Sequence, residues 1–198
     1  METKIIPAKR EDAQVVVRLM FNALGDYANF LMVSDNKNTT LNRLQQCFTS
    51  QETHQLHYSN CLVSVVDNEI VGASTAYAGN KIQNYSEKLS HIITGFKDDP
   101  IKIQDVIDNL KIMREAETDE YYMDTLSINK EYQKQGLSCV LIQGICKIAL
   151  DKGFSKLAIV VQEGKEYLLD YYKKQGFTVA GIKNLGEINY YRLLKNLK

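Results

Sequence analysis

Apolar and polar positions alternate over residues 121–128 and then change to helical spacing after a polar loop. This predicts a strand that leads through Asn129 to Gln135 into a helix opening at Gly136 and ending at Gly153. The alternation places Tyr122, Asp124, Leu126 and Ile128 on one face of the strand and Met123, Thr125 and Ser127 on the other. The apolar positions of the helix are Leu137, Leu141, Ile145, Ile148 and Ala149.

The first third of the chain shows further strand and helix patterns. Residues 3–8 fit a short edge strand limited by Pro7. A helix is expected from Glu11 to Gly25, and a second over 40–49 with Thr39 or Thr40 as its cap, separated by a loop around 34–38. Strands at 61–66 and 70–77 flank Asp67-Asn68-Glu69, a strong hairpin signal.

The last third continues with alternating elements. We expect a strand at 156–161, a helix at 165–175, and a final strand pair at 178–183 and 188–194.

Residues 78–119 separate two strands that would otherwise follow closely. Asp99 and Pro100 predict the start of a helix over 100–116, whereas 79–98 is polar with scattered apolar anchors. Long insertions are commonly functional. Two interpretations therefore stay open: an arm over a substrate site, or a peripheral packing or dimerisation element.

Composition bounds the kind of protein. The chain has 198 residues with 44% hydrophobic content, which suits one globular domain over 1–198. Twenty-four acidic residues balance 24 basic ones, so no overall field favours nucleic acid or an anionic membrane. No apolar run reaches the length of a membrane span, and residues 1–7 lack the core of a signal peptide. The four cysteines lack Cys-x-x-Cys spacing, which predicts free thiols in a reducing cytoplasm.

The strand–loop–helix unit suggests an anion site. Such a turn leaves backbone N–H groups at the helix start without partners, and the helix dipole adds attraction for a phosphate. Gly136 would let a phosphate reach the backbone, and Ser138 would add a hydroxyl donor. The alternative is an ordinary strand-to-helix turn with a glycine.

Gln133, Gly136 and Ser138 resemble the Gln/Arg-x-x-Gly-x-Gly/Ala motif of the GNAT superfamily, the acyl-CoA-dependent N-acetyltransferases. The preceding 126–128 resembles the family strand that leads into this loop. The sequence departs from the pattern at Ser138, where Gly or Ala is usual, and at Lys134 and Gln135, where a glycine is often found.

A second segment, from Tyr171 to Phe177, resembles the family's Leu-Tyr-x-x-x-Gly-Phe and places Tyr172 at the family's tyrosine. Leu168 stands where a small residue is usual, and Lys165 where an Asn often contacts the cofactor. The resemblance covers residues 121–198 well, and the first 120 residues match only in the order of elements.

The resemblance implies an α/β fold with a mixed, mostly antiparallel sheet, helices on both faces and a splayed parallel strand pair. It implies acetyl-CoA as acyl donor, with the pantetheine arm pairing with backbone at Leu126 and Ile128 and the pyrophosphate resting on the loop after them. The expected cofactor-binding residues are Leu126, Ser127, Ile128, Gln133, Lys134, Gln135, Gly136, Leu137, Ser138, Lys165, Leu168 and Lys174.

Direct acetyl transfer to an amine needs a base for the ammonium proton and an acid for the leaving thiolate. Tyr172 is the candidate acid by resemblance, against the alternative of a packed aromatic side chain. Asp124 is the candidate base because a carboxylate inside an apolar strand is costly unless it has a role, which could also be structural. Glu120 is a second choice for the base, and Tyr122 would line the same channel.

The remaining candidates carry less chemistry. His54 and His57 lie three apart without an evident third ligand, so no metal is expected. Cys139 falls in the first helical turn, where small core filler is the simpler role.

The acceptor would be an amine on a small molecule or peptide, which the sequence does not identify. Sheet-edge pairing would produce a homodimer, and nothing in the sequence requires one. Two other functions stay open: a silent acyl-CoA-binding sensor or assembly module, and transfer of a longer acyl chain.

Overall fold

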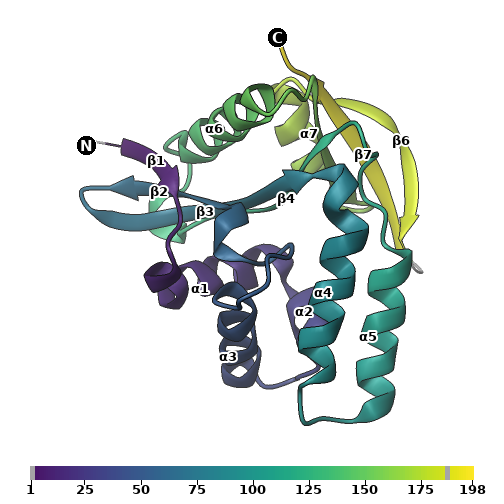
Figure 1. Cartoon of the computed structure of the whole chain (residues 1–198). Helices are drawn as coiled ribbons and strands as arrows, with labels where there is room; N and C mark the ends of the chain where they lie inside the picture. Colours follow the sequence, from purple (N-terminus) through teal and green to yellow (C-terminus); the bar gives the residue numbers. More distant parts are fainter. Residues whose placement is uncertain (1–2, 186–187) are drawn as a thin grey trace.

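The computed structural model describes residues 3–185 and 188–198, and its centre is a seven-stranded sheet with helices on both faces (Figure 1). The strand order is β1-β2-β3-β4-β5-β7-β6, and every neighbouring pair is antiparallel except β4 and β5. This confirms the expected fold class. The strands are β1 (Thr3–Pro7), β2 (Cys61–Val66), β3 (Glu69–Ala78), β4 (Tyr121–Ile128), β5 (Lys156–Gln162), β6 (Thr178–Leu185) and β7 (Ile188–Asn196).

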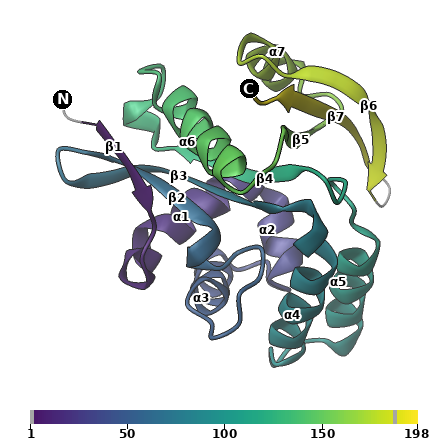
Figure 2. The ribbon, with the colours of Figure 1, turned by 45° about the horizontal axis from the view of Figure 1, so that its top comes forward.

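The helices divide between the two faces of the sheet (Figures 1 and 2). One face carries α6 (Leu137–Asp151) and α7 (Glu166–Lys174), which share a hydrophobic cluster with Leu157 and Leu193 of the sheet. The other face carries α1 (Ala13–Leu24), α2 (Asp26–Leu31), α3 (Lys37–Phe48), α4 (Ile82–Thr94) and α5 (Pro100–Ile112).

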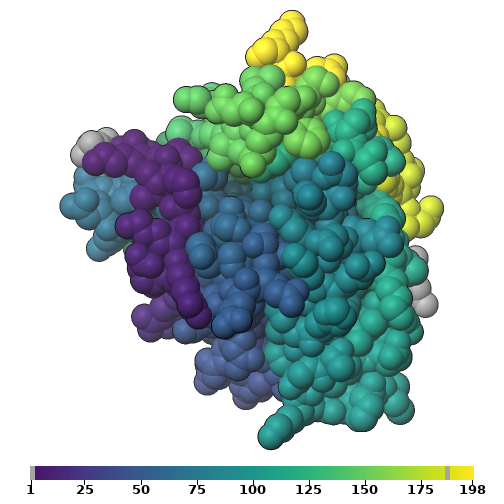
Figure 3. Space-filling model, in the orientation of Figure 1, coloured from purple at the N-terminus to yellow at the C-terminus, as the bar shows by residue number. Residues whose placement is uncertain are grey.

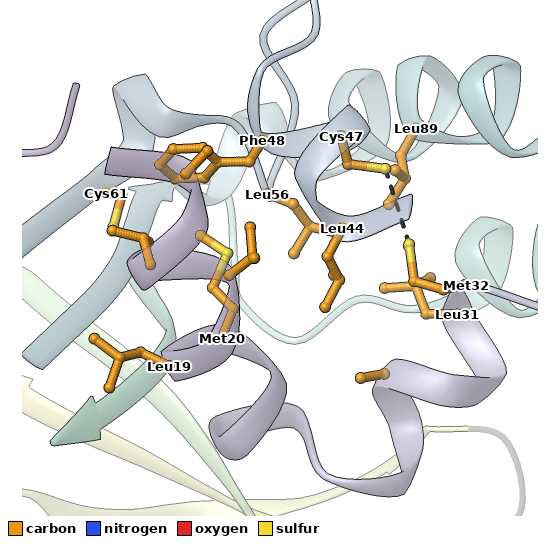
Figure 4. Close-up of a cluster of buried hydrophobic side chains, with 14 of the residues drawn as sticks. Leu19, Met20, Leu31, Met32, Leu44, Cys47, Phe48, Leu56, Cys61 and Leu89 are labelled. Atoms are coloured by element: carbon orange, nitrogen blue, oxygen red, sulfur yellow. Dashed lines mark hydrogen bonds between the residues drawn. The ribbon is translucent and has the colours of Figure 1, made fainter. Parts of the chain in front are cut away.

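Large side chains without solvent contact hold the first three helices beneath the sheet (Figure 4). Met20 of α1, Leu44 and Phe48 of α3 and Met32 after α2 meet there, and the Cys47 thiol lies 4.0 Å from the Met32 sulfur. Burying a side chain of this size contributes about 1.5–3 kcal/mol each. This cluster fixes the face of β3 and β4 that is turned toward α1.

Local signals explain most element boundaries. Asp67 and Asn68 both have positive φ, 47° and 70°, as a type I′ hairpin turn requires, so the predicted hairpin is confirmed. The predicted cap at Thr39 or Thr40 is wrong: α3 begins earlier because Asn36 has extended backbone and its side chain accepts hydrogen bonds from two N–H groups of the first turn. The short α2 was not predicted, since six residues are too few for a helical period.

The insertion at 79–119 forms two helices that lie side by side, α4 and α5 (Figure 1). The predicted start of α5 is confirmed, because the Asp99 side chain accepts from the Ile101 N–H at 2.9 Å, but the helix ends at Ile112 rather than 116. The polar interpretation of 79–98 missed α4, whose buried face includes Leu89 and Ile93.

Both helices of the insertion pack into the same cluster as α1–α3, so the insertion is no peripheral appendage. Figure 3 shows α4 and α5 lying against the rest of the surface without a visible break.

The chain between α5 and β4 is fixed tightly. The Glu120 carboxylate accepts from the Glu117 N–H at 2.8 Å and pairs with Arg192 of β7. The Gly79 N–H donates to the Glu120 carbonyl at 2.8 Å, and a Cβ added at Gly79 would lie 2.0 Å from the Glu117 carbonyl oxygen. The segment therefore depends on a residue without a side chain at Gly79.

Two further observations bound the molecule. The strands β1 and β6 are the edges of the sheet within the described chain, as predicted for residues 3–8. None of the helices in residues 3–185 and 188–198 combines the length and apolar character needed to cross a bilayer.

Replacing Gly79 with alanine is expected to lower the free energy of unfolding by about 1–3 kcal/mol, because the new Cβ meets backbone that cannot move freely. Chemical denaturation measures this. Gly95→Ala is the control, since Gly95 has φ −77° and its added Cβ would meet only the Ile92 oxygen, at 3.2 Å. Equal stability of Gly79→Ala and wild type would contradict the close packing of this segment.

Candidate active site

A bulge in β4 sets the direction of Asp124. The pairing of β3 with β4 runs through Thr75↔Thr125 and then Ala76↔Met123, so Asp124 is an extra residue without a partner on β3. A bulge shifts the alternation of side chains by one position and re-aims the bulged residue.

The shift corrects one prediction about β4. Tyr121, Met123, Leu126 and Ile128 all pack on the α6 side, whereas Tyr122 packs on the other side, where Asp124 meets Tyr77. The expected common face for Tyr122, Asp124, Leu126 and Ile128 is therefore wrong beyond Asp124. A strict period of two could not show the extra residue.

The two parallel strands separate directly before this bulge. β4 and β5 pair only at Tyr121↔Leu157 and Tyr122↔Ala158. Beyond these positions β5, β7 and β6 diverge from β4 (Figure 2). The expected splayed pair is thus confirmed, and β4 has an edge without a neighbouring strand over the rest of its length.

Backbone direction along this edge alternates. Thr125 uses its carbonyl toward β3, where the Ser74 hydroxyl donates to it, and the Asn129 N–H donates to Val71 at 2.7 Å. By alternation, the backbone groups of Leu126 and Ile128 face the open edge, as predicted. The Ile128 carbonyl already accepts from the Gln133 side-chain amide at 3.1 Å, which leaves Leu126 as the open position.

The loop after β4 forms a cradle of N–H groups. Within the described chain, the backbone N–H groups of 134–139 have no acceptor, and Gly136 at the N-cap of α6 receives no side-chain cap. Lys134 and Gly136 both have left-handed backbone, with φ 62° and 82°. A Cβ added at Gly136 would meet nothing within 4 Å, so open space lies before the helix start. Convergent donors at a helix N-terminus suit an anion such as a diphosphate.

A contact between α6 and α7 adds to this cradle. The Tyr171 hydroxyl donates to the Ser138 oxygen at 2.7 Å, which leaves the Ser138 proton free to donate elsewhere. The sequence assigned Tyr171 only to the apolar face of its helix. No local signal could show this contact, because it joins residues 33 positions apart.

Tyr172 lies half-buried between two aromatic rings. Its ring centroid is 5.2 Å from that of Tyr171 and 5.6 Å from that of Phe177. Its hydroxyl has no hydrogen-bond partner among residues 3–185 and 188–198, and burial raises its pKa above the usual value. A neutral hydroxyl without a protein partner suits a proton donor.

Three other predicted residues of α7 lie near Tyr172 in the chain. Leu168 packs into the cluster beneath the helix. Lys165 is the N-cap residue of α7, and Lys174 stands in its last turn, both with exposed side chains.

Asp124 points into a pocket between the sheet and helices α1, α2, α4 and α5. The Tyr77 hydroxyl donates to Asp124 Oδ2 at 2.9 Å. Burial raises the pKa of Asp124 to about 6, although the Tyr77 hydrogen bond opposes the shift. A carboxylate with such a pKa can hold and release a proton near neutral pH.

The sequence missed a second acid in this pocket. Glu115 follows α5 and lines the same pocket as Asp124. Burial and the nearby Asp124 charge raise the pKa of Glu115 to about 7. Its polar neighbourhood gave no signal, since only the fold brings the end of α5 beside β4. Glu120, the second choice for the base, is instead held by Arg192 and the Glu117 N–H, as described above.

The histidines and Cys139 have structural surroundings. His54 Nε2 lies 3.0 Å from the Cys47 carbonyl, its Nδ1 accepts from the Leu56 N–H, and burial lowers its pKa to about 4. The His57 ring bonds to Ser59 and to the Ser50 carbonyl. Within the described ranges, no cluster of three or more His, Cys, Asp or Glu side chains could bind a metal. Cys139 lies 3.6 Å from the Gln143 amide.

Known proteins resemble this chain in sequence and fold. Thialysine N-epsilon-acetyltransferase of Bos taurus is 33% identical over 55 residues, which are 28% of this chain and 32% of that protein. The match thus spans about a third of the relative's length. An N-acetyltransferase from Staphylococcus aureus Mu50 superposes with a TM-score of 0.78 at 23% identity, covering 96% of this chain and 99% of the other.

A more distant structural match is the ribosomal-protein-S18-alanine N-acetyltransferase from Escherichia coli, with a TM-score of 0.55 at 11% identity, covering 100% and 95% of the two chains. At such identities these two likenesses show the fold alone. A sequence model of the Acetyltransferase (GNAT) family, however, matches residues 31–177, which run from the end of α2 to Phe177. The chain therefore belongs to the GNAT family of acetyltransferases.

Proposed function

We propose that this chain is a single GNAT-type domain that transfers an acetyl group from acetyl-CoA directly to a primary amine. One observation carries the proposal: the open edge of β4 leads straight into the uncapped N–H cradle at Gly136, with a protonatable carboxylate, Asp124, on the same strand.

The donor side is assigned to the β4 edge and the cradle. The diphosphate would rest on the N–H groups from Lys134 to Ser138, with the Ser138 hydroxyl as an additional donor. The pantetheine arm would take the place of a strand beside Leu126. Gln133 supports this arrangement because its amide holds the Ile128 carbonyl at the start of the loop. The exposed ammonium groups of Lys165 and Lys174 suit the outer phosphates.

The acceptor side is assigned to the pocket at Asp124. An aliphatic amine arrives as ammonium and must lose one proton before it can attack. Asp124 takes this proton and later releases it to solvent. The bovine relative is named for acetylating an ε-nitrogen, which is an aliphatic amine of this kind.

The transfer step then balances. The amine nitrogen attacks the thioester carbonyl carbon, the C–N bond forms, and the C–S bond breaks. Tyr172 gives its proton to the leaving sulfur, and the second proton on the nitrogen restores Tyr172 through solvent. The products are the acetamide, the free thiol and one released proton.

Gly136→Ala is expected to weaken acetyl-CoA binding about tenfold, because a side chain disfavours the left-handed backbone that aims the N–H groups by about 1–2 kcal/mol. Gly153→Ala is the matched control. Gly153 has φ 84° at the opposite end of α6, and its added Cβ also meets nothing within 4 Å. Calorimetry should show similar losses of stability for both variants and a loss of affinity only for Gly136→Ala. Equal affinities would remove the cradle from the binding site.

Asp124→Asn is expected to lower kcat at least about a hundredfold, because general-base catalysis typically contributes that much. Wild-type kcat at saturating acceptor should rise as pH increases through about 6, where Asp124 loses its proton, and the variant should lack this limb. A pH profile of thiol release measures both. Persistence of the same limb in the variant would assign Asp124 a structural role.

Tyr172→Phe is expected to reduce kcat at least about tenfold, or about 1.4 kcal/mol, with little change in acetyl-CoA affinity, since only the proton on the leaving sulfur is lost. Tyr167→Phe is the control, because Tyr167 is 72% exposed on the same helix. Unchanged turnover of Tyr172→Phe would reduce Tyr172 to a packing residue. A folded protein that binds acetyl-CoA but acetylates no amine would support the binding-module function instead.

A further inference from the structure

The pocket at Asp124 contains groups that accept hydrogen bonds but lacks a cation. Two carboxylates, those of Asp124 and Glu115, line it together, and each remains partly accessible. No Lys, Arg or His belongs to its lining among the described residues. An uncompensated pair of acids in a partly desolvated site favours a positively charged occupant.

Gln55 provides an independent sign that a ligand is missing. Its side chain lines the pocket, the residue is only 8% exposed, and Oε1 has no hydrogen-bond partner within the described chain. A buried acceptor without a donor costs about 1–3 kcal/mol. The backbone on both sides of Gln55 is fixed by the His54 ring, which accepts from the Leu56 N–H. The unpaired oxygen is thus held in place at the pocket wall.

Neighbouring cations do not neutralise Glu115 directly. Lys183 and Arg114 act on it only as nearby charges. The Lys183 ammonium donates to the Arg114 carbonyl at 2.6 Å and to Glu117 at 2.8 Å, and the Arg114 guanidinium donates to the Met113 carbonyl at 2.8 Å. Towards the sheet, the groups near Asp124 and Glu115 are tyrosine hydroxyls, those of Tyr27, Tyr77, Tyr122 and Tyr190.

The rest of the wall is apolar and the space inside is narrow. Leucines of α1, α2 and α5 and Met113 supply the apolar surface. The cavity has a volume of about 30 Å³, so rings and branched groups do not fit without displacing the walls. A methylene chain is the thinnest group that can bury apolar surface against such walls.

We propose, on the basis of the function proposed above, that the acceptor is a linear aliphatic di- or polyamine. The reacting nitrogen lies at Asp124, and a second ammonium group is held by Glu115 with the Gln55 carbonyl oxygen as a further acceptor. An α-amino acid or an acidic peptide is disfavoured, because its carboxylate would meet two acidic side chains.

The test compares α,ω-diaminoalkanes with 1-aminoalkanes of equal chain length, using thiol release from acetyl-CoA. Wild type should favour the diamine in kcat/KM by about tenfold or more, because the second ammonium gains a hydrogen bond between charged groups. Glu115→Gln should reduce the ratio of diamine to monoamine by about ten- to a hundredfold. Glu87→Gln removes a charge from the exposed face of α4 and should leave this ratio unchanged.

Gln55→Leu keeps both carboxylates and provides a second test should Glu115→Gln fold poorly. It should reduce the same ratio about threefold to tenfold, since a neutral acceptor contributes less than a charged one. A wild-type ratio near one, or a ratio that neither variant changes, would overturn the proposal.

Calorimetry with the diamine and free CoA separates this proposal from the proposed function. Diamine binding that weakens in Glu115→Gln, in a protein that acetylates no amine, would refute the enzymatic function and support the diamine site. Thiol release with monoamines alone would support the enzyme and refute the diamine site.

Discussion

The loss of pairing between β4 and β5 beyond Tyr122 is the constraint on which the rest of the site depends. A strand in the middle of a sheet normally uses all its backbone groups for its neighbours. Here β4 keeps an open edge while its other edge stays bonded to β3. An extended ligand can therefore enter the sheet as an additional strand, and it meets the N–H cradle where the strand ends.

The bulge at Asp124 is the second half of the same arrangement. Without the extra residue, a side chain at this position would continue the alternation set by Met123 and Leu126. With it, the acid turns to the side of Tyr77 and Glu115, while the open edge remains free. One irregularity in one strand thus separates the donor side of the proposed reaction from the acceptor side.

This arrangement costs stability. Asp124 has a pKa raised from 3.8 to about 6, so the native protein keeps a proton that the unfolded chain has already lost in this range. By linkage, the free energy of unfolding falls as pH rises through that window. Glu115, with a pKa of about 7, adds to the effect in the same direction. Acids that reduce stability at neutral pH fit a binding or catalytic role better than a structural one.

The sequence by itself determined the elements whose causes are local: the hairpin at Asp67 and Asn68, the cap at Asp99, the helix that opens at Gly136, and the loop motif that carries the family resemblance. These follow from backbone preferences of neighbouring residues. The tertiary structure alone decided the bulge at Asp124, the contact of Tyr171 with Ser138, and the meeting of Glu115 with Asp124 and Gln55. Each of these joins segments far apart in the chain, and no local periodicity records which distant strand or helix will lie opposite.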